Sequence, residues 1–124
     1  MAKNNSYSAV LAPSSAPANT TKSAPGRTSS TVNMQPNYGT GITVAVTNGA
    51  SAPGSPPQAQ IQVSGDDATW RDYGTPLVGD TTANSLNTWA VDVAKHWMYA
   101  RVIFFGHTTN PVTVAVEAQA ATGL

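Results

Sequence analysis

The densest run of large apolar side chains in this chain is Trp97-Met98-Tyr99-Ala100-Arg101-Val102-Ile103-Phe104-Phe105. In an extended strand, successive side chains point to opposite faces, and both faces of this stretch are largely apolar. A helical period fits less well, because no polar stripe recurs every three or four residues. The stretch therefore predicts a central β-strand that is covered on both faces for most of its length, with the other strands packed around it.

Shorter segments on either side of this stretch alternate apolar and polar residues, which is typical of half-buried strands. They are separated by turns rich in Gly, Pro, Asn and Asp. The segments cover residues 41–48, 58–64, 70–73, 84–93 and 112–119, and residues 28–34 add a first, edge strand. This pattern predicts an all-β fold, an antiparallel β-sandwich or jelly roll of about seven or eight short strands.

The same alternation assigns side chains to the core or to the surface. The residues expected in the core are mostly β-branched or aromatic and share the inward parity of their segments: Ile42, Val44, Val46, Ile61, Val63, Trp70, Trp89, Val91, Val102, Phe104, Val112, Val114 and Val116. The glutamines Gln58, Gln60 and Gln62 have the opposite parity. They are expected to form an outward row that is neutral and able to form hydrogen bonds.

The composition excludes several classes of function. The chain has 124 residues, with six basic and six acidic side chains, and only 10% of its residues are charged, against about 25% in an average soluble domain. It therefore has no basic stripe for nucleic acid and no run of about 20 apolar residues for a membrane helix. The lack of cysteine excludes disulfides and thiolate chemistry. Few charges also give weak repulsion between molecules, which favours association.

Residues 1–27 differ from the rest, because Ser, Ala, Pro, Thr and Asn fill most of this segment. Such a segment buries too little apolar surface to offset its ordering entropy, so we expect it to be disordered in the isolated chain. We also expect it to become ordered by docking on a neighbouring subunit through Tyr7, Val10 and Leu11. The expected organisation is an extended N-terminal arm, 1–27, followed by a β-sandwich domain, 28–124.

The polar clusters suit turn chemistry better than metal binding or catalysis. Asp66, Asp67 and Asp72 lie close together, but calcium takes about six to eight oxygen ligands, and aspartate also caps tight turns. His96 and His107 have no cysteine or glutamate cluster beside them. The serines lack a Gly-x-Ser-x-Gly elbow. The sequence therefore predicts no catalytic residue, no metal and no cofactor.

Four aromatic residues, Trp70, Tyr73, Trp97 and Tyr99, are either a sugar-stacking platform or core filling, and core filling is favoured because aromatic residues dominate small β cores. Arg101 lies inside the central strand. It either pairs with another strand's Asp92 across the sheet or reaches the rim at an interface.

Candidate partner-binding residues follow from these observations. Arg27 stands at the transition into the fold, and Tyr99 and Arg101 are the plausible outward contacts of the central strand. Together with the apolar residues of the arm, they form the expected set: Tyr7, Val10, Leu11, Arg27, Tyr99 and Arg101.

Residues 58–119 resemble small β-sandwich proteins of tailed-bacteriophage virions. The resemblance rests on four pieces of sequence, which are Gln60-Ile61-Gln62-Val63-Ser64-Gly65-Asp66-Asp67-Ala68-Thr69-Trp70, Trp89-Ala90-Val91-Asp92-Val93, Tyr99-Ala100-Arg101-Val102, and Val112-Thr113-Val114-Ala115-Val116-Glu117-Ala118. Capsid cement (decoration) proteins and tail or fibre components of phages use similar modules, and an extended N-terminal arm is consistent with a cement protein.

The resemblance implies a non-enzymatic virion protein that bridges and stabilises neighbouring major capsid subunits through its arm and its β-sandwich. It implies a homo-oligomer, a dimer or trimer, on the capsid surface, with no nucleic acid and no membrane as partner. No apolar leader follows Met1, so synthesis in the host cytoplasm without export is expected. The alternative is a tail or fibre component with a carbohydrate-binding surface.

Overall fold

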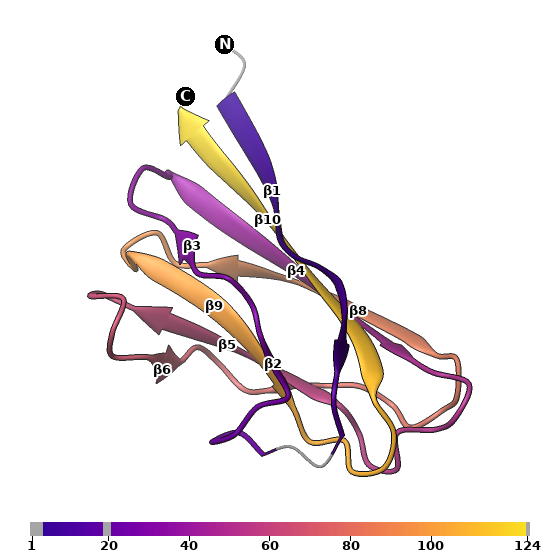
Figure 1. The fold of residues 1–124 in the computed structure, drawn as a ribbon. Helices are drawn as coiled ribbons and strands as arrows, with labels where there is room; N and C mark the ends of the chain where they lie inside the picture. Colours follow the sequence, from indigo (N-terminus) through magenta and orange to yellow (C-terminus); the bar gives the residue numbers. More distant parts are fainter. Residues whose placement is uncertain (1–3, 19–20, 124) are drawn as a thin grey trace.

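The computed structural model describes residues 4–18 and 21–123, with residues 4, 5, 122 and 123 described by their backbone alone. Two antiparallel sheets pack face to face (Figure 1). Their strands are β1 (Asn4–Ala16), β2 (Arg27–Thr28), β3 (Val32–Asn33), β4 (Gly39–Asn48), β5 (Gln58–Ser64), β6 (Arg71–Asp72), β7 (Leu77–Val78), β8 (Leu86–Val93), β9 (Tyr99–Phe105) and β10 (Val112–Gly123). The predicted all-β sandwich is confirmed.

The first sheet has the order β1-β10-β4-β8, and the second has the order β2-β9-β5-β6, with β3 also paired to β9 and β7 to β5. No segment in the described ranges forms a helix long and apolar enough to cross a membrane.

The central strand predicted from the sequence is β9, which lies between β5 on one side and β2 and β3 on the other. Val102 and Phe104 face the core, and Ile103 and Phe105 are buried on the opposite face. A salt bridge from Lys22, beyond the β2 edge, reaches Asp72 in β6. Residues 21–26 therefore extend over the outer face of the second sheet and contribute to the cover of β9.

The core lies between the sheets and is built mainly from β-branched residues of β4, β10 and β5. Burying each such side chain contributes about 1.5–3 kcal/mol relative to exposure. Most of the predicted core is buried, but Trp70, Trp89 and Val91 are only partly so. Trp89 and Val91 belong to β8, an edge strand without a neighbour on one side, and Trp70 packs against Arg101.

One predicted outward residue is buried. Gln60 has no exposed surface, because the connection between β6 and β7 folds over it. Its Nε2 donates hydrogen bonds to the carbonyl oxygens of Tyr73 at 3.3 Å and Gly74 at 3.2 Å. The expected row of exposed glutamines is therefore wrong at this position, since periodicity identifies a face but not the segments that cover it.

The N-terminal segment also differs from the expectation of a disordered arm that a neighbouring subunit orders. Residues 4–16 form β1, which runs beside β10 of the same chain (Figure 1). Val10 and Ala16 are buried in the core, and Leu11 packs against it. Backbone hydrogen bonds need no large side chains, so the edge of β10 orders a Ser/Ala segment that composition alone predicts to be unstructured.

The single strand expected at residues 28–34 is two short strands, β2 and β3, both paired with β9. Ser29 lies between them and is buried. Its backbone N–H donates to the Val102 carbonyl oxygen at 2.8 Å, and its Oγ accepts from the Val102 N–H at 2.9 Å. The backbone N–H and C=O groups of Val102 are therefore hydrogen-bonded even where the strand beside β9 is interrupted between β2 and β3.

The docking of β1 can be tested through Val10. We expect Val10→Ala to lower the free energy of unfolding by about 1–2 kcal/mol, because it removes two buried methyl groups. Ala9→Ser, on the exposed face of the same strand, is the control and should leave stability unchanged. Urea denaturation measures both, and equal stabilities for Val10→Ala and the parent chain would show that β1 does not pack as described.

Candidate functional site

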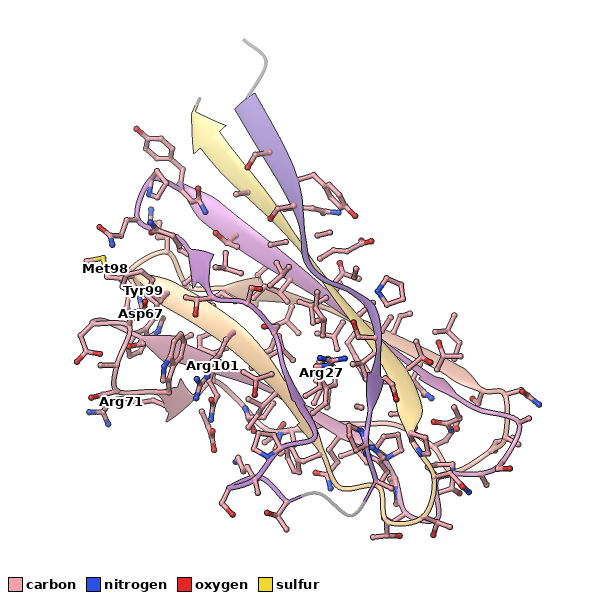
Figure 2. All side chains as sticks on the ribbon, viewed as in Figure 1. Arg27, Asp67, Arg71, Met98, Tyr99 and Arg101 are labelled. Carbon is pink, nitrogen blue, oxygen red and sulfur yellow. The ribbon has the colours of Figure 1, made fainter. Side chains whose placement is uncertain are left out.

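The predicted partner-binding residues do not form one surface. Tyr7 is 60% exposed on the first sheet, whereas Val10 is buried and Leu11 is half-buried against the core. Tyr99 and Arg101 lie along β9, and Arg27 lies apart from them (Figure 2).

Arg27 has a role within the fold. Its Nε donates a hydrogen bond to the Ser15 carbonyl oxygen at 3.2 Å, which links β2 of the second sheet to β1 of the first. Tyr99 also has an internal partner, since its hydroxyl accepts a hydrogen bond from Nε2 of Gln35 at 2.7 Å.

Arg101 is held on the outer face of the second sheet. Its guanidinium lies over the Trp70 ring, 4.3 Å from the centroid, and its Nε donates to Oε1 of Gln62 at 2.9 Å. Burial lowers the pKa of Arg101, while the charge of Asp67 opposes that shift. Asp92 belongs to β8 of the other sheet, so the predicted alternative of an Arg101–Asp92 pair is wrong.

Hydrogen bonds continue from Arg101 across this face. Nε2 of Gln62 donates to Oδ1 of Asp72 at 3.1 Å, and Lys22 donates to the same carboxylate. The hydrogen bond from Lys22, followed by that from Gln62, lowers the pKa of Asp72. The charged groups of this face are therefore largely engaged with one another.

The four aromatic residues weighed as a sugar platform are also engaged within the chain. Trp70 lies under Arg101, and Trp97 packs against the core. The hydroxyl of Tyr73 accepts from the Ala94 N–H at 3.1 Å and lies 3.3 Å from the Asp92 carbonyl oxygen, to which it donates. These residues, with Tyr99, do not form a common exposed platform.

The aspartates after β5 act in a turn. Oδ1 of Asp66 accepts from the backbone N–H groups of Thr69 at 2.8 Å and Ala68 at 3.0 Å. These two bonds, with a third from Ser64, lower the pKa of Asp66 to about 2. Asp67 has a positive φ of 60°, a conformation that aspartate tolerates in turns. The turn interpretation of this cluster is supported.

The two histidines have separate local roles. His107 is fully buried, and its Nε2 donates to the Ala16 carbonyl oxygen at 2.9 Å, which ties the end of β1 to the loop after β9. His96 stacks against Trp97 with ring centroids 5.3 Å apart. They do not share a site.

The outer face of the first sheet is built from all four of its strands. Strand register places residues in rows across β1, β10, β4 and β8. One row is Tyr7, Gln119, Gly41 and Asp92, and the next is Ala9, Glu117, Thr43 and Ala90. Beyond these rows the face carries mainly alanine and threonine, so it is flat and nearly uncharged.

A groove lies at one end of this face, where Gly39 and Gly41 of β4 leave its floor without side chains. Its first part, about 470 Å³, is lined by Tyr7, Gly41, Asp92 and Gln119, together with Ser6, Ala120 and Ala121. Its second part, about 390 Å³, shares Gly41 and Asp92 and adds Tyr38, Gly39 and Lys95. We call both parts together the Gly39/Gly41 groove.

Two tyrosines flank this groove, Tyr7 in the first part and Tyr38 in the second, and each is 60% exposed. A hydrogen bond with Glu117 raises the pKa of Tyr7. The groove thus combines exposed aromatic rings with a carboxylate and an amide, the combination of groups that ligand-binding pockets use for contact area and orientation.

The second open feature is the free edge of β8. The Asn48 N–H donates to the Ser85 carbonyl oxygen at 2.8 Å, so the odd-numbered residues of β8 bond to β4 and the even-numbered ones face away. The hydrogen bond from Tyr73 to the Asp92 carbonyl oxygen agrees with this assignment. Leu86, Thr88 and Ala90 therefore present their N–H and C=O groups outward. No described strand pairs with them.

Reasoning from the sequence missed both features. The signal for the groove is the pair Gly39 and Gly41, since two glycines at alternate positions of one strand point to a bare patch on one face. Asp92 and Gln119 join this patch only through strand pairing between distant segments.

No family model matches the chain, and no curated protein matches it either. Solved structures with a similar fold include a mutant VP2 protein of infectious bursal disease virus in derived T=1 particles. That structure has 7% identity and a TM-score of 0.54 over 96% of this chain and 32% of the other. A chain in the structure of the Gx strain of this virus has 10% identity and a TM-score of 0.51 over 94% and 31%.

A family 29 carbohydrate-binding module from Piromyces equi has 10% identity and a TM-score of 0.49 over 92% of this chain and 90% of the other. This chain spans about a third of the length of the viral chains. At such identities the similarities show the fold alone. The two viral structures agree with the β-sandwich part of the resemblance, and the virion role and the tailed-phage origin stay predictions.

The turn after β5 predicts a pH dependence of stability. A carboxyl whose pKa falls from 3.8 unfolded to about 2 folded stabilises the fold above its unfolded pKa, and that contribution is lost as the pH falls through the folded pKa. Asp66→Asn is the matched control, because it keeps the Oδ1 acceptor without titrating. We expect the stability of the parent chain, relative to Asp66→Asn, to fall between about pH 4 and pH 2.

Urea denaturation of both proteins across this range measures the difference. A constant difference from pH 4 to pH 2 would contradict the role given to the Asp66 carboxylate.

Proposed function

We propose that this chain is a non-enzymatic structural protein of a virion, a cement or decoration protein that bridges and stabilises neighbouring major capsid subunits on the capsid surface. The observation that carries this proposal is the open edge of β8 beside the flat outer face of the first sheet. Both are suited to protein contact, one through main-chain hydrogen bonds and the other through close approach of small side chains.

Natural β-sheets usually protect their edges with short strands, bulges, proline or charge. In the described chain, the second sheet ends in strands of two residues each, which are β2 and β3 on one side and β6 and β7 on the other. β1 carries three register shifts and Pro13. β8 has an unbroken eight-residue register with β4 and contains no proline or lysine. Protection against edge pairing is therefore visible at the other edges and is weakest at β8, where Asp92 near the end is the one charged residue.

The size of the outer face indicates how it is used. Four strands about 4.8 Å apart, each with about eight residues at about 3.3 Å, cover roughly 500 Å². A stable interface uses about 800 Å² per partner. This face alone is therefore too small for a strong single contact. Edge pairing at β8, association into a homo-oligomer and repetition over a symmetric shell would raise the total binding strength by multivalency.

The N-terminal strand fits this proposal in a modified form. Because Val10 is buried in the chain's own core and Leu11 packs against it, an arm that docks on a neighbour through these residues would first have to leave β10. Tyr7, in contrast, is exposed in the present arrangement. We therefore assign bridging contacts to the exposed side of β1 and to β8, without release of the strand.

A different observation favours the alternative, a tail or fibre component with a carbohydrate-binding surface. That observation is the Gly39/Gly41 groove with its two exposed tyrosines. The free edge of β8 and the groove are separate sites, so variants at each site test the two functions separately.

The proposal is tested with Ala90→Pro. Proline removes the Ala90 N–H, which faces away from β4, so the variant should fold with a melting temperature within a few degrees of the parent chain. We expect its occupancy on particles assembled without the native protein to fall at least tenfold. Ala90→Thr keeps the N–H and is the matched control, with occupancy equal to that of the parent chain.

Occupancy is measured by sedimenting the particles and quantifying the bound protein. Cryo-electron microscopy of the coated particles shows its position. Full occupancy by folded Ala90→Pro would contradict the role of β8, and failure of the parent chain to bind would contradict the cement function.

A further inference from the structure

We propose that the Gly39/Gly41 groove is a binding site for a neutral, hydroxyl-rich carbohydrate. The groove shares Tyr7 and one end of the outer face of the first sheet with the surface assigned to the cement function, but the inference does not depend on that function. It rests on the floor of the groove, on its aromatic walls and on the polar groups between them.

The floor is bare although the backbone does not require glycine there. The described glycines with positive φ are Gly54, Gly74 and Gly106, so Gly39 and Gly41 have strand geometry that any residue adopts. A Cβ added at Gly39 would meet nothing within 4 Å, and one at Gly41 would lie 3.6 Å from Oδ1 of Asp92, an ordinary contact.

Glycine inside a strand reduces its stability, because it adds freedom to the unfolded chain and gives no side-chain packing. Neither turn geometry nor crowding offsets this loss at Gly39 and Gly41. What the two glycines provide is an open surface at which another molecule can approach the backbone of β4 closely.

The walls of the groove contain the two most exposed tyrosines of the described chain, Tyr7 and Tyr38. The face of an aromatic ring carries partial negative charge, which attracts the polarised C–H groups on the apolar side of a pyranose ring. Such a platform costs little conformational entropy, since a tyrosine has only two side-chain torsions to restrict.

The polar groups between the tyrosines match the other face of a sugar. The Asp92 carboxylate accepts hydrogen bonds, and the Gln119 amide both donates and accepts. Within the described residues, the Tyr73 hydroxyl bonds to the backbone oxygen of Asp92 and not to its carboxylate. Its carboxylate is therefore available to neighbouring hydroxyl groups of a ligand.

The charges select against anionic ligands. Asp92 lines the groove and Glu117 bonds to Tyr7 at its wall, whereas Lys95 is the only cation among the lining residues. A carboxylated, sulfated or phosphorylated sugar would meet two negative side chains. A neutral glycan would meet acceptors for its hydroxyl groups, so we assign the site to neutral sugars.

The test uses the full chain and an array that contains neutral and anionic glycans, followed by titration of the best neutral glycan. We expect binding to neutral glycans only. Gly41→Val places a side chain on the floor, where its Cβ would have no neighbour closer than 3.6 Å, and should weaken binding at least tenfold while leaving the melting temperature unchanged or higher. Ala45→Val, on the same face of β4 but away from the groove, is the matched control and should bind as the parent chain does.

Tyr7→Ala and Tyr38→Ala should each weaken binding at least tenfold, and Tyr38→Phe should retain it, because stacking needs the ring and not the hydroxyl. Two binding results would each overturn the inference: no neutral glycan bound at millimolar concentration, or unchanged binding by folded Gly41→Val. A third result that would overturn it comes from NMR spectra recorded during the titration, if the chemical-shift changes centre on Trp70 and Arg101 instead of the groove. Particle occupancy is a separate measurement, so failure here leaves the cement function untouched.

Discussion

The register between β4 and β10 is the constraint on which the rest of the structure depends. These strands pair from Gly39 opposite Ala121 to Asn48 opposite Val112 without a shift. Because side chains alternate, this register sends Val44 to the core and Gly41 to the outer face at the same time. A slip of one residue would exchange the two faces. The core and the groove are therefore consequences of one set of backbone hydrogen bonds.

The parts of the fold that were predictable are those in which the side chains themselves carry the signal. Two-sided apolar content identified β9, and strict alternation identified β4 and β10, since burial of their β-branched residues dominates local stability. β1 lacks such a signal. Its Ser/Ala sequence is ordered by the free edge of β10, and single-sequence reasoning cannot see which edge is available to a segment.

The candidate surfaces were less predictable than the fold, for the same reason. Tyr7 and Asp92 lie at opposite edges of the first sheet, and only the pairing of β1, β10, β4 and β8 puts them in one row. The residues that were predicted as contacts are instead those whose charge or aromatic ring stands out in the sequence, such as Arg101. Its charge is used inside the chain, in contact with Trp70 and Gln62, where it orders the outer face of the second sheet.

The two open surfaces meet at Asp92. The backbone carbonyl oxygen of Asp92 accepts a hydrogen bond from the Tyr73 hydroxyl. The same hydroxyl accepts a hydrogen bond from the Ala94 N–H, so Tyr73 closes the edge of β8 at that end. An added strand would therefore pair along Leu86 to Ala90 and stop before the groove, whose wall begins with the side chain of Asp92. Edge pairing and sugar binding do not compete for the same atoms. A strand added at β8 would by itself leave the groove uncovered, because the groove lies on the face of the sheet and not on its edge.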